Sequence, residues 1–90
     1  MRSEISAYNV NDPNSGTPNL DGMHEDDLAE FAEEVMDADI PKSIRLQLAS
    51  YASHKALAMR HRSRGYVGIA RREEAICDRI YNNLPIKWQW

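Results

Sequence analysis

The residues whose types and spacing could support chemistry are Lys55 and Glu73, which both lie within otherwise apolar helix faces. An unpaired charge at such a position is costly. Two arrangements avoid that cost. Either the two side chains form a buried ion pair, or Lys55 extends its ammonium to the helix edge while Glu73 takes solvent or an arginine. A catalytic pair would need further reactive groups nearby, and none is evident, so we do not expect an enzyme.

The remaining reactive residue types also favour structural roles. His54 and His61 are seven residues apart, whereas metal-binding helices place histidines three or four apart and add a further ligand. Cys77 lies on an apolar helix face, as expected of a buried small residue in a reducing compartment. No glycine-rich phosphate loop, nucleophile elbow or cysteine pair occurs. We therefore assign no catalytic, cofactor-binding or metal-ligating residue, and we expect no cofactor.

The elements that position these residues are two long helices, expected at about 41–63 and 66–84. At 100° per residue, one face of the first is formed by Ile44, Leu48, Tyr51, Ala52, Ala56 and Met59. The matching face of the second is formed by Ile69, Ala70, Ile76, Cys77, Ile80 and Leu84. In an antiparallel hairpin that turns at Arg64-Gly65, facing residue numbers add to a constant value. The predicted contacts are Ile44 with Leu84, Leu48 with Ile80, Ala52 with Ile76, and Met59 with Ile69.

A shorter, acidic helix is expected at about 23–38, with an inner stripe of Leu28, Phe31, Ala32 and Val35. Residues 1–22 are rich in turn-forming residues and are expected to be a flexible or extended N-terminal arm. The aromatic tail at 85–90 should either fold back near Ile44 or anchor a partner. The sequence thus predicts an all-α fold, in which the acidic helix packs on a long antiparallel helical hairpin within a single domain at 23–90.

The charges of the 90-residue chain are segregated along its length. Residues 1–40 hold eleven acidic residues and one arginine, a net charge of −10, whereas residues 41–90 hold ten basic and three acidic residues, a net charge of +7. A near-balanced total of −3 therefore conceals a strong dipole. Five arginines gather at the hairpin turn: Arg60, Arg62, Arg64, Arg71 and Arg72.

These patterns favour a small helical protein-interaction module without catalytic activity. The outer side of helix 41–63 carries a weaker apolar stripe, and the candidate partner anchors are Leu46, Leu57, Trp88 and Trp90. Because the ordered core is small, we expect self-association, as a dimer in the simplest case. The alternative is weak, nonspecific binding of nucleic acid or another polyanion by the arginine cluster. No segment is long and apolar enough to suggest a membrane partner, and cytoplasmic localisation is expected.

Overall fold

The computed structural model describes residues 17–90, so the part of the predicted arm at 1–16 lies outside the described residues. Within residues 17–90 the elements are η1 (Leu20–Gly22), α2 (Glu25–Val35), α3 (Lys42–Ser63), α4 (Val67–Asn83) and η2 (Ile86–Trp88). This part of the chain contains no strand, which confirms the all-α fold, and the helix bounds differ from the predicted ones by at most three residues. None of these helices combines the length and the apolar character needed to cross a membrane.

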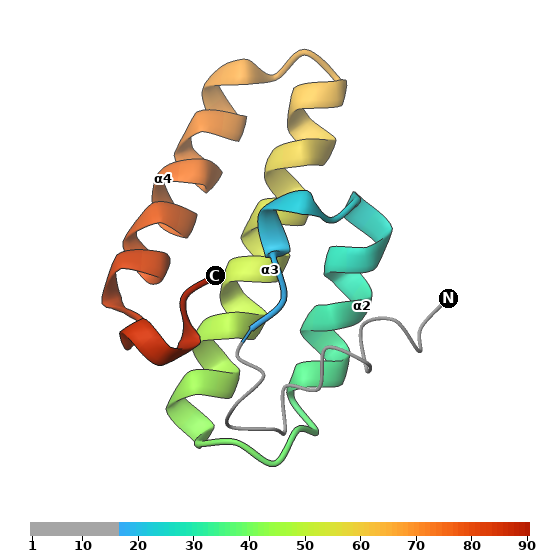
Figure 1. The fold of residues 1–90 in the computed structure, drawn as a ribbon. Helices are drawn as coiled ribbons and strands as arrows, with labels where there is room; N and C mark the ends of the chain where they lie inside the picture. The colour runs from blue at the N-terminus through green and yellow to red at the C-terminus, as the bar shows by residue number, and fades with distance from the viewer. Residues whose placement is uncertain (1–16) are drawn as a thin grey trace.

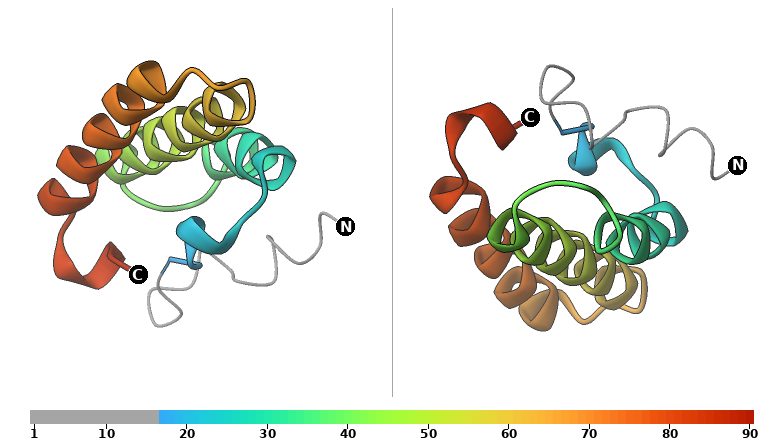
Figure 2. Two further views of the ribbon diagram at one scale, coloured as in Figure 1. Left: turned by 90° about the horizontal axis from the view of Figure 1, so that it is seen from above. Right: turned by 90° about the horizontal axis from the view of Figure 1, so that it is seen from below.

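Helix α3 is the centre of the arrangement, because it packs against both α2 and α4 (Figure 1). The predicted antiparallel hairpin is therefore confirmed as α3 and α4, with the acidic helix α2 on the other flank of α3. Seen along the helices, α2, α3 and α4 form one curved layer, and η1 and the C-terminal segment lie on the same side of it (Figure 2).

Helix α3 ends at a turn that contains Gly65, as the sequence predicts. Gly65 has a φ of 84°, in the left-handed region that glycine adopts without a steric cost. The Tyr66 N–H donates to the His61 carbonyl at 2.8 Å, and the Gly65 N–H donates to the Arg62 carbonyl at 3.1 Å. These are the two bonds of a Schellman motif, which satisfies carbonyls at the helix end and reverses the chain.

The connection from α2 to α3 is fastened by Arg45. Its Nη1 donates to the carbonyls of Ala38 and Ile40 at 3.2 and 3.1 Å, so backbone groups of the loop find a partner on the next helix. Pro41 precedes the first residue of α3, where a missing N–H has no consequence for the helix.

The core is built from all three helices and from both flanking segments. Its buried members are Leu20, Leu28, Phe31, Val35, Ala38, Ile40, Ile44, Leu48, Tyr51, Ala52, Ala56, Cys77, Leu84 and Trp88. Leu20 has no exposed surface, although residues up to Gly22 were predicted to stay outside the domain. The core therefore begins before the predicted boundary.

Helix α4 meets α3 in the predicted register but is rotated about its own axis. The Cys77 Sγ lies 3.6 Å from the Tyr51 carbonyl. The two residue numbers have the same sum as those of each predicted contact, such as Leu48 with Ile80. The buried residues of α4, Ala70 and Cys77, are followed seven residues on by buried Leu84, whereas Ile69 is 43% exposed and Ile76 is partly exposed. The reason is that α2 packs on the other flank of α3, so α3 is the α-helix that packs on α4 and one side of α4 stays exposed.

The burial of α3 and α4 predicts unequal costs for two similar truncations. Leu48→Ala should lower the free energy of unfolding by about 2–5 kcal/mol, because Leu48 is fully buried. Ile69→Ala should cost less than about 1 kcal/mol, since much of that side chain is already in water. Urea unfolding of the two variants measures both values, and an equal or reversed order would contradict the burial described here.

Candidate functional site

Of the two arrangements considered for Lys55 and Glu73, the direct ion pair is not formed, because each side chain has another partner. The Glu73 Oε1 lies 2.5 Å from Nδ1 of His54, the residue that precedes Lys55. The Lys55 Nζ lies 3.6 Å from the Asp21 Oδ1 in η1. Periodicity correctly placed both residues beside the hairpin interface, but it could not show that η1 brings a carboxylate to Lys55.

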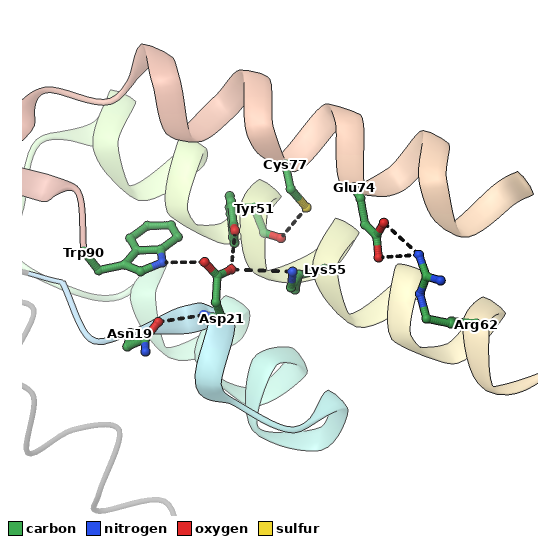
Figure 3. Close-up of polar contacts among 8 residues, drawn as sticks. All are labelled: Asn19, Asp21, Tyr51, Lys55, Arg62, Glu74, Cys77 and Trp90. Carbon is green, nitrogen blue, oxygen red and sulfur yellow. Dashed lines mark hydrogen bonds and ion pairs between the residues drawn. The ribbon is translucent and has the colours of Figure 1, made fainter. Parts of the chain in front are cut away.

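Asp21 is the centre of a polar cluster that sequence reasoning missed (Figure 3). Its carboxylate accepts hydrogen bonds from the Tyr51 hydroxyl at 2.5 Å and from the Trp90 Nε1 at 3.3 Å, in addition to the ion pair with Lys55. The Asn19 side chain accepts from the Asp21 N–H at 3.2 Å and holds the turn. One carboxylate thereby links η1, α3 and the end of the chain, and contacts this distant in sequence leave no periodic signal.

The aromatic tail folds back onto the hairpin, as one of the two alternatives predicted. Trp88 is buried in the core, and the Trp90 ring meets Tyr51 and Tyr81 edge-on, with centroid distances of 4.6 and 4.7 Å. The Tyr81 hydroxyl also donates to the Trp90 carbonyl at 2.5 Å. In this arrangement the candidate anchor Trp88 is buried, and the Trp90 ring is engaged within the chain.

Cys77 is a buried thiol, in agreement with its position on the apolar face. Burial raises its pKa from about 9 to about 11, because the thiolate would lose its hydration. Burial also raises the pKa of the neighbouring Tyr51 hydroxyl, and the hydrogen bond to Asp21 acts in the same direction. Neither group is poised as a nucleophile at neutral pH.

The five arginines at the hairpin turn divide into two groups. Arg60 donates from Nε to Glu25 at 2.8 Å, and Arg62 donates from Nη2 to both oxygens of Glu74 at 2.8 and 2.9 Å. The other three are exposed and have no ion-pair partner among residues 17–90: Arg64, Arg71 and Arg72. The acidic helix thus neutralises only one member of the cluster, through Glu25.

Apolar side chains are exposed beside these three arginines. Tyr66 is 53% exposed and Val67 is 40% exposed, and Ile69 follows on the next turn. We refer to residues 64–72 as the hairpin tip. It combines unpaired positive charge with exposed apolar surface, a combination that suits protein contacts better than simple solvation.

A groove lies between α2 and α3 on the side of α3 that faces away from the core. Its volume is about 560 Å³, and it is open to solvent. The lining residues are Ala29, Ala32, Glu33, Met36, Ala49, Ser50, Ser53, Ala56, Leu57 and Arg60. We call this feature the outer groove. It contains Leu57, one of the predicted anchors, while Leu46, another, is 48% exposed one helical turn beyond the lining residues of α3.

The groove follows from the small residues that line it. Alanine and serine from the two helices leave a floor of low relief, and the larger side chains of Met36 and Leu57 border it. The sequence stripe of Leu46, Ser50, Ser53 and Leu57 indicated this side of α3, but the contribution of α2 could be located only once the helices were packed.

Residues 17–90 contain no group of three or more histidine, cysteine, aspartate or glutamate side chains that could hold a metal ion. No protein-family model, curated protein or solved structure matches the chain. Its function must therefore be inferred from its own surfaces.

The raised pKa values predict a loss of stability at alkaline pH. Below about pH 9 the Cys77 thiol is protonated in both the folded and the unfolded chain. Between pH 9 and 11 only the unfolded chain ionises, so the free energy of unfolding should fall, by up to about 2–3 kcal/mol from this group. Tyr51 adds to the fall, because its pKa is raised too.

Urea unfolding across this pH range measures the effect. The free energy of unfolding should decline less steeply with pH in the Cys77→Ala variant than in the wild type. Comparing the two proteins corrects for the lysines, which titrate in both. Parallel declines would mean that Cys77 is not held protonated by burial.

Proposed function

We propose that the chain is a small helical protein-interaction module and that the outer groove is its docking surface. The observation that carries the proposal is an open, largely apolar groove on the outer side of α3. Apolar surface that remains in water is a reservoir of binding free energy, and grooves between helices accept a complementary ridge from a partner. Leu57 within the groove and Leu46 beyond it supply side chains that such a partner would bury.

The electrostatic character of the groove indicates the chemistry of the partner. Exposed carboxylates occur along the adjacent side of α2, at Asp26 and Glu33, and just beyond the helix at Asp37. The spacing of seven residues places Asp26 and Glu33 on one side of the helix. The partner should therefore present an apolar ridge bordered by basic residues.

The proposal assigns no reaction to the chain and places it in the cytoplasm, where a single buried thiol such as Cys77 needs no disulfide partner. Polyanion binding is the second candidate, supported by Arg64, Arg71 and Arg72, which are exposed and have no ion-pair partner among residues 17–90. It ranks lower because the aliphatic side chains of Val67 and Ile69 lie exposed beside them, and a phosphate backbone makes no use of aliphatic surface.

Site-directed photocrosslinking tests the docking surface. A benzophenone maleimide can be attached to Ser53→Cys in the outer groove or to Asn82→Cys on α4, since both positions are exposed while Cys77 is buried. In extracts of the source organism, irradiation should give protein adducts from position 53 and not from position 82. Comparable adducts from both positions, or none from position 53, would contradict the proposal.

A competition experiment links the adducts to the groove itself. An excess of unlabelled wild-type chain should suppress them. The Leu57→Glu chain should compete much less well, because it places a charge on the apolar lining of the groove. Equal competition by the two chains would show that the adducts form outside the groove.

A further inference from the structure

The hairpin tip projects beyond the rest of the molecule. Helix α2 starts opposite Arg60, so the last turn of α3 and the first turns of α4 have no third helix beside them (Figure 1). This projection carries the exposed side chains Tyr66, Val67 and Ile69 together with the unpaired Arg64, Arg71 and Arg72. A convex surface of this kind needs a concave partner with an apolar floor and carboxylates at its edge.

The outer groove has both properties. Its floor is formed by alanine and serine residues, and Met36 and Leu57 border it. Asp26 and Glu33 lie on the neighbouring side of α2, and Asp37 lies just beyond the helix. These three carboxylates have no ion-pair partner among residues 17–90, as is also true of the three arginines of the tip. The exposed charges of the tip are positive and those beside the groove are negative, so each surface can pair with the charges of the other.

The dimensions of the two surfaces also agree. A volume of about 560 Å³ is within the range of roughly 300–1,000 Å³ in which proteins bury compact ligands. It can accept a small cluster of side chains such as Tyr66 with Val67. The small residues of the floor allow the backbone of an incoming helix to approach closely.

The tip cannot enter the groove of its own chain. Helix α3 contributes to both features, and it is a continuous helix of 22 residues, roughly 33 Å long. Its end cannot bend back onto its own middle without breaking backbone hydrogen bonds. Any contact between tip and groove is therefore made between two molecules.

We infer that the occupant of the outer groove is the hairpin tip of a second copy of this chain. This inference rests on the proposed docking function and names its partner. If two chains align their α3 helices antiparallel, each tip lies over the groove of the other, and the contact is made twice about a two-fold axis. The exchange satisfies three arginines and three carboxylates on each side and closes the assembly as a dimer.

Paired charge reversals test the inference. The tip variant carries Arg71→Glu and Arg72→Glu, and the groove variant carries Glu33→Lys and Asp37→Lys. A matched control reverses Lys42 and Arg79 to glutamate, two exposed basic residues outside both surfaces. All the reversed side chains are exposed, so circular dichroism and urea unfolding should show folded chains in each case.

Sedimentation velocity at micromolar protein and low salt then gives the oligomeric state. The wild type and the control should be dimers that weaken as salt is added. Each of the two variants alone should be at least roughly tenfold weaker, because like charges now meet at both contacts. An equimolar mixture of the two should recover a one-to-one dimer, since the reversed tip of one chain complements the reversed groove of the other.

A monomeric wild type, a mixture that stays monomeric, or a control as weak as the tip variant would overturn the inference. The proposed docking function would survive the first result if the groove crosslinks to a different protein, in an adduct whose mass is not twice that of the chain. It would fail independently if position 53 gives no adduct at all.

Discussion

The structure depends on how the open side of a three-helix layer is closed. Because α3 packs between α2 and α4, the inner faces of the three helices form a concave surface rather than an enclosed core. Leu20 from the N-terminal side and Trp88 from the C-terminal side fill this surface, and both are buried. The Asp21 carboxylate then joins the two segments across α3 through Tyr51 and Trp90. Residues near both ends of the described chain are thus part of the core, as a small domain requires.

This closure decides which surfaces remain for function. The aromatic tail, which could have anchored a partner, is occupied inside the molecule, where Trp88 contacts the core and Trp90 meets two tyrosines. The features left in solvent include the outer groove, on the opposite side of α3, and the hairpin tip beyond α2. They differ in charge because most acidic residues precede Pro41 and most basic residues follow it. The same segregation that gives the chain its dipole gives it two complementary surfaces.

The sequence predicted those parts of the fold that rest on local periodicity. Apolar spacing located three helices, and Gly65 with its left-handed φ marks the turn that sets the hairpin register. Partner choice by Lys55 was not predictable, because it depends on η1, more than thirty residues away in sequence. The rotation of α4 was missed for a similar reason: Ile69 looks like a core residue until the packing shows that α3 is the α-helix that covers α4. Of the candidate site, the α3 side of the groove was indicated by its stripe, but the groove itself requires the packing of two helices.

The most direct test of this account is the contribution of Trp88 to stability. If the C-terminal segment closes the core, Trp88→Ala in the full chain should lower the free energy of unfolding in urea by about 3–5 kcal/mol, as expected for a buried tryptophan. The loss would affect the whole domain, because the cavity would open beneath α3. A loss below about 1 kcal/mol, typical of a surface residue, would show that the tail does not complete the core and would contradict the closure on which the assignment of the free surfaces rests.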